Sequence, residues 1–426
     1  MPRINADRLM TDLSRLRAIG AVGTGVVRPA FSQEDMTARL WLQDRFTEAG
    51  LETVIDGVGN VFGRSPWPGP ALLVGSHSDT QPRGGWLDGA LGVIYALEIV
   101  RALAEDASTA DYAVDAVSWQ DEESNFLGCL GSRSWCGLLD AEEERAAHGL
   151  DGESLADALV RTGLAGVPRL AREPGRHVGY LEAHIEQGLV LEDAGEQLGV
   201  VTSIVGIRGL ELTFTGETNH AGTTTMARRR DAATALFEVA HRINTLFPER
   251  AGPHTVWTIG SVSLEPGAAS IVPGRATLIL QFRDPDDGVL DRLENTVVKL
   301  CEEIAARGRI GAAVRRTRSP VRPSLMDTDL QDHIAAAAQT VAPGRWRRMP
   351  SAAGHDPMVI HHCLPCGMLF IPSIGGISHD FAEDSHTGDI VAGCQALADA
   401  TASVLGAART RGPSDHTTSI RSTRDG

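Results

Sequence analysis

Residues 71–80 read ALLVGSHSDT and residues 112–123 read YAVDAVSWQDEE, and these two stretches indicate the fold class. Each is a short apolar run that ends in polar residues, which is typical of a strand in a sheet. Between them, residues 91–106 read LGVIYALEIVRALAED and have apolar residues at helical spacing. The alternation of strand, helix and strand predicts a layered α/β fold.

The same alternation continues on both sides of this unit. Segments with helical or strand-like patterns occur before it at residues 5–50 (two helices) and 53–64 (TVIDGVGNVFGR), and after it at 178–193 (VGYLEAHIEQGLVLED). They occur again beyond about residue 322, at 366–376 (CGMLFIPSIGG) and 388–407 (a helix). We therefore predict one discontinuous α/β domain with a mixed sheet, made of residues 1–205 and 322–408.

The pattern changes between residues 206 and 321. This stretch has the order strand, helix, strand, strand, helix, with GIRGLELTFTGE at 206–217, TVWTIGSVSL at 255–264 and ATLILQFRDP at 276–285. Such an order usually gives a compact antiparallel sheet with helices on one face, so we predict an inserted α+β domain of ferredoxin-like type. The polar stretch 409–426, rich in Ser, Thr and Arg, is predicted to be disordered.

Composition excludes several classes of protein. The chain has 426 residues, 42% of them apolar and 22% charged, which is ordinary for a globular protein of two domains. A net charge of -16 disfavours nucleic acid as a partner, because binding to phosphates needs a basic surface. The first residues lack the apolar core of a signal peptide, and no window reads as roughly 18 apolar residues, so we expect a cytoplasmic protein without a membrane span.

Six cysteines are too few for a disulfide scaffold in so long a chain, and reduced thiols are expected. Cys363 and Cys366 form a CxxC directly after His361 and His362. The sequence has no second cysteine pair at zinc-ribbon spacing, so a metal site there is not favoured and the role of the two cysteines stays open.

Metal-capable side chains follow several of the predicted strands. These residues are His77, Asp79, Asp88, Glu122, Glu123, His184 and His379. In a layered α/β sheet the carboxyl ends of strands converge on a crevice, so side chains from distant segments can meet there. Imidazole and carboxylate together suit zinc, manganese, cobalt or nickel, and a carboxylate between two ions can bridge them. Each segment alone is a weak signal, and their joint appearance predicts a metal site.

Six motifs, in order, resemble the amidohydrolase branch of the dinuclear zinc peptidase family, which contains N-carbamoyl-L-amino-acid hydrolases and allantoate amidohydrolases. They are GSHSDTQPRGGWLDGALGV (75–93), SWQDEE (118–123), EAHIEQG (182–188), NHAGTTTMARRRDA (219–232), SIVPG (270–274) and GGISHD (375–380). The resemblance covers about residues 60 to 380. It implies a catalytic domain of zinc-peptidase type and an inserted dimerisation domain.

The resemblance also implies two divalent ions in each subunit. Five residues would be the ligands, with Asp88 bridging the ions: His77, Asp88, Glu123, His184 and His379. Asp79 would lie in the second shell and hold the imidazole of His77 in its orientation.

Glu122 would be the general base in such a site. Coordination lowers the pKa of water from ~15.7 to roughly 7, and Glu122 would take a proton from that water and pass it to the leaving nitrogen. His220 would reach the site of the neighbouring subunit and stabilise the developing oxyanion, which implies a homodimer.

Several residues match positions that the family uses to grip its substrate. They are Gln187, Arg283, Gly375 and Gly376, with Arg283 expected on a substrate carboxylate. Ser270 stands where carbamoylase relatives have Asn, and Ser124, Asn125 and Phe126 replace the usual residues after the glutamate pair, so the natural substrate is uncertain. His355 is expected to contact either the substrate or the metal ligands.

The leading hypothesis is an amidohydrolase that cleaves a linear C–N bond, ureido, carbamoyl or amide, of a small carboxylate-bearing substrate. One alternative keeps the metal centre and makes the protein an aminohydrolase of an unusual, possibly aromatic, acid. Others are a dipeptidase and a non-catalytic small-molecule binder, although retention of both Glu122 and Glu123 argues against an inactive binder.

Overall fold

The computed structural model describes residues 1–411, which divide into two compact units. The larger unit holds Met1–Thr202, Leu325–Met349 and the chain from His355 on, and the smaller unit holds Ser203–Ser324 and Pro350–Gly354. The two main divisions fall within three residues of the boundaries expected at 205/206 and 321/322. The short return of Pro350–Gly354 to the smaller unit was not expected from the sequence.

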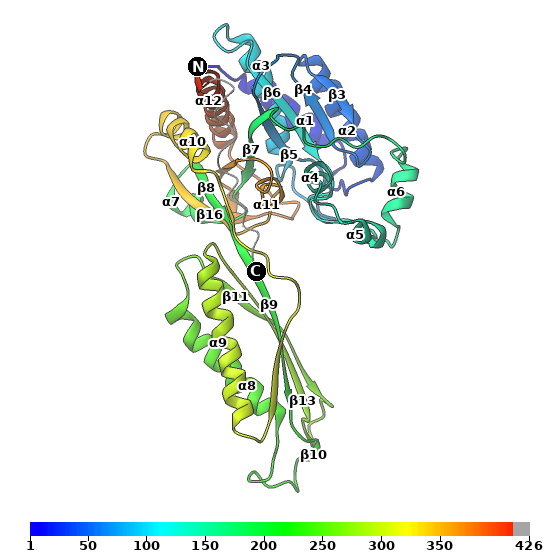
Figure 1. The fold of residues 1–426 in the computed structure, drawn as a ribbon, viewed down its shortest axis with the longest axis vertical. Helices are drawn as coiled ribbons and strands as arrows, with labels where there is room; N and C mark the ends of the chain where they lie inside the picture. Colours follow the sequence, from blue (N-terminus) through cyan, green and yellow to red (C-terminus); the bar gives the residue numbers. More distant parts are fainter. Residues whose placement is uncertain (412–426) are drawn as a thin grey trace. The chain divides into compact units, whose positions relative to one another are not determined.

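A mixed sheet forms the centre of the larger unit (Figure 1). Within the described residues its strands lie in the order β15-β8-β17-β7-β5-β6-β4-β3, and β16 also pairs with β8. In chain order they are β3 (Glu52–Ile55), β4 (Val61–Arg64), β5 (Ala71–His77), β6 (Ala113–Trp119), β7 (His177–Ile185), β8 (Leu198–Ile204), β15 (Ser324–Leu325), β16 (Trp346–Ser351) and β17 (Cys366–Ile371).

The middle of this sheet is parallel. Strands β5, β6, β7 and β17 pair in parallel, whereas β3, β4 and β8 pair antiparallel to their neighbours. The four parallel strands are almost wholly buried, as expected for strands covered on both faces. Their carboxyl ends lie at one edge of the sheet, and this edge carries His77, His184 and the loops that follow β6 and β17.

Helices cover the sheet and short helices fill the connections. They are α1 (Ala6–Ala18), α2 (Gln33–Glu48), α3 (Ala90–Glu105), α4 (Leu130–Cys136), α5 (Ala141–Ala146), α6 (Leu155–Arg161), α7 (Val190–Ala194), α10 (Thr328–Val341), α11 (Pro357–Ile360), the 3-10 turn η1 (Ile374–Gly376) and α12 (Thr387–Arg411). Side-chain caps set several of the starts: Asn5, Ser32 and Asp327 each accept a hydrogen bond from a backbone N–H of the first turn. A small hairpin, β1 (Ala21–Val22) and β2 (Gly25–Val26), connects α1 to α2.

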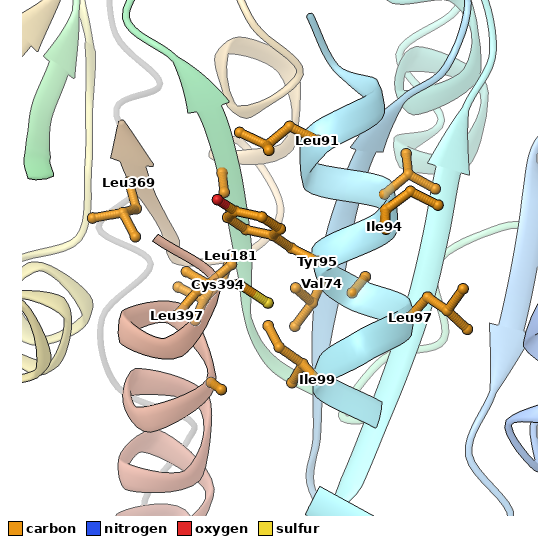
Figure 2. Packing of buried hydrophobic residues seen from close by; sticks show 14 of the residues in the cluster. Val74, Leu91, Ile94, Tyr95, Leu97, Ile99, Leu181, Leu369, Cys394 and Leu397 are labelled. Atoms are coloured by element: carbon orange, nitrogen blue, oxygen red, sulfur yellow. The ribbon is translucent and has the colours of Figure 1, made fainter. Parts of the chain in front are cut away.

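Helices α3 and α12 pack together on the sheet. Figure 2 shows Tyr95 of α3 among apolar side chains that include Leu397 of α12 and Leu181 of β7, all of them fully buried. The Tyr95 hydroxyl donates a hydrogen bond to the carbonyl of Ile390, which ties the two helices by a polar contact as well. Because α3 begins at Ala90, this packing also fixes the position of Asp88, two residues earlier.

Helix α12 bears on two sequence expectations and corrects one of them. It continues through Arg411, so residues 409–411 are helical and not disordered, while residues 412–426 lie outside the described residues. Arg409 explains the longer helix, because it pairs with Asp111 at 2.9 Å and lies over the ring of Tyr112. The segment Thr387–Thr410 is also long and apolar enough to cross a membrane by length and composition, but 61% of its most apolar window is buried inside the fold, as in a core helix.

The smaller unit has the predicted ferredoxin-like order. It runs β9 (Gly206–Thr215), α8 (Ala232–Arg250), β11 (Val256–Glu265), β13 (Arg275–Asp284), α9 (Asp287–Ala306) and β14 (Gly311–Arg316), with a short ribbon of β10 (Asn219–His220) and β12 (Ile271–Val272). The sheet order is β11-β13-β9-β14, all antiparallel. Alternate residues of β9 and β13 are buried under α8 and α9 (Figure 1). The α/β class with an inserted α+β unit is therefore confirmed.

Candidate metal centre and active site

The first candidate metal-binding group consists of His77, Asp88 and His184, all buried at the carboxyl edge of the sheet. The Nε2 atoms of the two histidines are 3.4 Å apart. Asp88 Oδ1 lies 3.9 Å from Nε2 of His77 and 3.1 Å from Nε2 of His184. Burial lowers the pKa of His184 to about 4, so its imidazole is neutral at neutral pH and keeps a lone pair for a cation.

The second group consists of Asp88, Glu123 and His379. Nε2 of His379 lies 3.2 Å from Oδ2 of Asp88 and 3.5 Å from Oε1 of Glu123. Glu123 comes from the loop after β6, and His379 follows η1 with 49% of its side chain exposed, so this group faces solvent on one side. Asp88 therefore belongs to both groups and turns one carboxylate oxygen to each.

Glu122 lies beside the first group. Its Oε2 is 3.6 Å from Nε2 of His77, and its side chain is 10% exposed. Burial, followed by the negative charge of Glu123, raises the pKa of Glu122 well above its usual value. Consecutive carboxylates thus reach different neighbours, His77 for Glu122 and His379 for Glu123. This arrangement leaves one of them free to act as a base while the other binds a cation.

The chemistry of these side chains fits divalent cations. Within residues 1–411, the ion pairs of Asp88, Glu122 and Glu123 are all with imidazoles. Burial and the charge of Asp88 raise the pKa of Glu123 to about 8, which reflects negative charge that the surrounding side chains do not balance. A dication at each group would balance it, and mixed nitrogen and oxygen donors suit zinc and neighbouring first-row ions.

Asp79 contacts His77 differently from the expectation. The backbone carbonyl of Asp79 lies 3.0 Å from Nδ1 of His77, whereas the nearest carboxylate oxygen is 3.8 Å away. The Asp79 carboxylate instead accepts a hydrogen bond from the backbone N–H of Glu123 and lies 3.7 Å from the guanidinium of Arg39. The side chain of Asp79 therefore holds the Glu123 loop, and its carbonyl orients the imidazole.

Gln187 lies inside the metal-capable cluster. Its Nε2 donates to Oδ2 of Asp88 at 2.9 Å and to the Ser378 hydroxyl at 3.1 Å. The Ser378 hydroxyl lies 3.2 Å from Oδ2 of Asp88 and 2.9 Å from Oε2 of Glu383, and it donates its one proton to either carboxylate. The other oxygen of Glu383 accepts from the backbone N–H groups of Leu87 and Asp88. Gln187 therefore orients the carboxylate shared by the two groups, and its contact with substrate stays a prediction.

Ser378, Glu383 and Gln81 were missed by reasoning from the sequence. Gln81 donates from Nε2 to Oε2 of Glu123 at 2.7 Å, and Ser378 and Glu383 hold the Asp88 loop as described. A signal was available for two of them, because Gln81 and Ser378 lie within motifs already singled out at 75–93 and 375–380. Glu383 follows the last motif by three positions and carries no comparable signal.

The backbone around the cluster is strained. Non-glycine residues with positive φ within residues 1–411 are Phe31, Asp121, Ser124, Cys129, Gln187 and His379. Asp121 and Ser124 flank the glutamate pair, and Gln187 and His379 belong to the cluster itself. Left-handed backbone at non-glycine residues costs of order 1–3 kcal/mol each, and it concentrates at sites where geometry matters more than local stability.

His355 is fully buried beside the first group. Its ring centroid lies 4.4 Å from that of His184, and together with Glu182 these histidines form a third set of metal-capable atoms. Glu182 accepts hydrogen bonds from the hydroxyls of Tyr180 and Ser76, which places it beneath the cluster and away from solvent. The fold therefore brings His355 to the site, where its ring packs against the ring of His184.

Gly375 and Gly376 lie in η1, between β17 and His379. The N–H of Gly375 donates to the Glu192 carboxylate at 2.8 Å. Gly376 has a φ of +64°, and a Cβ there would lie 2.9 Å from Leu189. Both glycines therefore belong to the loop that carries His379.

His220, Ser270 and Arg283 belong to the smaller unit. His220 and Ser270 are exposed neighbours at the β10-β12 ribbon, where the carbonyl of Ser270 accepts from the N–H of Ala221. Arg283 lies near the other end of β13 and donates to the carbonyl of Ala352 and the side chain of Gln281. Arg283 is thus separate from His220 and Ser270 within the unit, and none of the three is part of the groups around Asp88.

Replacing Gly89 by alanine is expected to weaken metal binding about 10- to 100-fold, as changes to the supports of metal ligands do. A Cβ at this position would lie 2.3 Å from Nε2 of His77, and its φ of +65° strains any other residue. Titration of the metal-free protein with Zn²⁺ or Mn²⁺ measures the change. Gly388→Ala is the matched control, because a Cβ there meets no atom within 4 Å, and equal losses in both variants would contradict the argument.

Comparisons with known proteins show the family of this chain. The family model described as Peptidase family M20/M25/M40 matches residues 73–403. The N-carbamoyl-L-amino acid amidohydrolase of Geobacillus stearothermophilus is 34% identical over 404 residues, covering 92% of this chain and 97% of the relative. The allantoate amidohydrolase of Escherichia coli (strain K12) is 33% identical over 384 residues, covering 88% and 92%. A crystal structure of an amidase of the hydantoinase/carbamoylase family from Burkholderia phymatum matches with a TM-score of 0.91 and 50% identity, covering 96% of this chain and 100% of that one. These matches confirm the resemblance drawn from the six motifs: the chain belongs to the peptidase family M20/M25/M40, where it is most similar to amidohydrolases.

Proposed function

We propose that this protein is an amidohydrolase that cleaves the C–N bond of a carbamoyl or ureido group on a small carboxylate-bearing substrate. The observation that carries the proposal is the sharing of Asp88 by two metal-capable groups, with the carboxylate of Glu122 beside them. Two relatives that match nearly the whole chain are named for hydrolysis of N-carbamoyl amino acids and allantoate. Their names do not favour the aminohydrolase, dipeptidase or binder alternatives.

Two divalent ions, zinc or else manganese, cobalt or nickel, would be held by His77, Asp88 and His184 and by Asp88, Glu123 and His379. Such ions polarise the carbonyl to be attacked and bring the pKa of water to roughly 7. Gln187 and Ser378 keep the shared carboxylate oriented through their hydrogen bonds to Oδ2 of Asp88. We also propose a cytoplasmic location. Free cysteines are usual there, and the six cysteines form no disulfide within the described residues.

Glu122 takes a proton from the attacking water and returns it to the leaving nitrogen. Its carboxylate is nearly buried, and burial, followed by the charge of Glu123, raises its pKa, so it takes up a proton more readily than an exposed carboxylate does. The neighbouring carboxylates favour uptake of the proton, and the leaving nitrogen, which gains an electron pair as its C–N bond breaks, then takes the proton from Glu122. Expulsion of ammonia then leaves a carbamate, which decomposes to carbon dioxide and the free amine.

Residues of the smaller unit would hold the substrate. Arg283 is half-buried, and among residues 1–411 its guanidinium donates to neutral oxygens only, those of Gln281 and Ala352, so its charge remains available for a substrate carboxylate. His220 would donate to the developing oxyanion. Ser270 next to it is smaller than the asparagine of carbamoylases, which changes the contacts offered to the substrate. The loop glycines Gly375 and Gly376 would allow close approach of the substrate beside His379.

The distances within the smaller unit support a homodimer. Arg275 and Arg283 lie at opposite ends of β13, about 26 Å apart at ~3.3 Å per residue, and the β10-β12 ribbon with His220 and Ser270 follows the Arg275 end (Figure 1). One small substrate cannot reach both ends of one straight strand. If Arg283 and His220 serve the same substrate, they must come from different copies of the chain. Exposed Val256 and Val262 on the edge strand β11 offer an apolar surface for such a contact.

A heterodimer of His220→Ala and Glu122→Gln subunits is expected to regain half of the activity of the wild-type dimer. In this heterodimer, one site combines an intact Glu122 with the intact His220 of the other subunit, and the second site lacks both. Co-expression with two different tags and tandem purification isolates the heterodimer, and the two mutant homodimers are the controls. No activity above the homodimers would mean that His220 serves its own subunit.

The proposed reaction is tested with N-carbamoyl amino acids, allantoate, aromatic amino acids and dipeptides, measuring ammonia and carbon dioxide together. Hydrolysis of a carbamoyl or ureido group releases both gases, deamination releases ammonia alone, and peptide cleavage releases neither. We expect equal amounts of the two from at least one ureido compound. Ammonia without carbon dioxide would support the aminohydrolase alternative instead.

A further inference from the structure

Cys136 and Cys363 form a close pair in the larger unit. Their sulfur atoms are 2.6 Å apart, although the residues are 227 positions apart in the sequence. Atoms without a bond between them rest at roughly 3.5–4.0 Å, and a disulfide is about 2.05 Å long. The fold has therefore brought two thiols nearly to bonding distance. The partner of Cys363 is thus Cys136, and not Cys366, which is fully buried at the start of β17.

Small oxidants can reach this pair. Both cysteines are partly exposed. Cys363 lines a cavity of about 1180 Å³ in the larger unit, together with His361, His362 and Arg172. The cavity lies at the side of the sheet where β5 and β7 begin, away from the carboxyl edge that carries the metal-capable groups. Chemistry at Cys363 therefore does not need access to the active site.

The surroundings also make Cys363 the better nucleophile of the two. The hydrogen bond from the Cys136 thiol lowers the pKa of Cys363, and the positive charge of Arg172 acts in the same direction against the effect of burial. The same hydrogen bond raises the pKa of Cys136. Thiolates and not thiols react with oxidants, so Cys363 should react first and Cys136 second.

We propose that Cys136 and Cys363 are a reversible redox site that closes to a disulfide under a peroxide. The Cys363 thiolate attacks hydrogen peroxide, the O–O bond breaks, and sulfenic acid and, after protonation, water are formed. Cys136 then gives up its proton and attacks the sulfenic sulfur, which forms the S–S bond and expels the hydroxyl group as a second water. Two thiols and one peroxide thus give one disulfide and two waters, and a dithiol reductant reverses the change.

The disulfide would fasten two segments that approach the active site. Cys136 ends α4, which follows the loop of Glu122 and Glu123, and Cys363 follows α11, which begins directly after His355 and Asp356. A hydrogen bond of 2.6 Å from the Ser132 hydroxyl to Asp356 already joins the same two segments. A covalent link at their other end would resist separation of α4 from α11, and we therefore expect it to raise the melting temperature.

Peroxide titration of the full-length wild-type protein tests the proposal. Oxidation should lower the number of thiols that react after denaturation from six to four, and a non-reducing peptide map should show one crosslink, between Cys136 and Cys363. The melting temperature should rise, and dithiothreitol should reverse both changes. Cys136→Ser and Cys363→Ser should abolish the crosslink and the shift, whereas Cys301→Ser, which removes a buried cysteine of the smaller unit, should keep both.

Other outcomes of the map would overturn the proposal. These are a crosslink of Cys363 to Cys366, oxidation of Cys363 to sulfinic acid without a crosslink, and retention of all six reactive thiols at a peroxide excess that oxidises free cysteine. The wild-type map is decisive by itself, so the conclusion does not depend on the folding of the variants. None of these measurements uses enzymatic activity, and they stand apart from the proposed amidohydrolase reaction.

Discussion

Glu122→Gln lowers kcat by about 100- to 10,000-fold, the contribution typical of a general base, and leaves the metal content unchanged. Glutamine has nearly the same shape as glutamate and keeps the contact with His77, but it cannot take up a proton. Because Glu122 belongs to neither of the two groups that share Asp88, both groups keep their donors. The expected signature is a large loss of turnover with little change in KM, measured alongside metal analysis of the same sample.

Glu123→Gln is the matched control for this variant. It changes the adjacent residue in the same way, but it removes the charge of a proposed ligand, so metal content should fall together with activity. Thermal unfolding provides a second check: Glu122→Gln should not lower the melting temperature of the metal-free protein, because a neutral amide removes repulsion among buried carboxylates. Undiminished turnover in Glu122→Gln at full metal content would show that another group is the base.

The residues located at strand ends were the part of the site that could be predicted from the sequence. His77, Glu122 and His184 stand at or just after β5, β6 and β7, and the sequence pattern places each strand correctly. Once the strands are parallel neighbours, their ends must meet, so local patterns are enough to bring these residues together. The fold class follows from the same alternation, and the ferredoxin-like unit from its own order of strands and helices.

The contacts made by loops could not be predicted from local sequence patterns. The carbonyl of Asp79, and not its carboxylate, meets His77, because the loop after β5 turns the side chain toward Arg39 and Glu123. Gln187 turns to Asp88 through a positive φ that no motif encodes. The contact of Cys136 with Cys363 depends on how α4 packs on α11. These contacts depend on tertiary packing, which the spacing of residues along the sequence does not specify.

Loss of the shared carboxylate should have the widest effect on the site. In Asp88→Asn one of the two oxygens becomes an amide nitrogen, which cannot bind a cation, and the remaining oxygen is uncharged. Both groups depend on this residue, since Oδ1 faces His184 and Oδ2 faces His379. We expect bound metal to fall from two ions per subunit to one at most. Activity should fall at least ~1000-fold, because several kcal/mol of transition-state stabilisation are lost at about 1.36 kcal/mol per factor of ten.

Elemental analysis after gel filtration measures the loss of metal, and circular dichroism establishes that the variant is folded. Asp380→Asn is the matched control: Asp380 is next to His379 in the sequence, but it contacts Arg83 at the surface and belongs to neither group. It should keep both ions and most of the activity. Two ions retained in Asp88→Asn would mean that the groups do not share this carboxylate. One ion retained with full activity would mean that a single metal suffices, because the remaining group, with Glu122 beside it, then supplies all that the reaction requires.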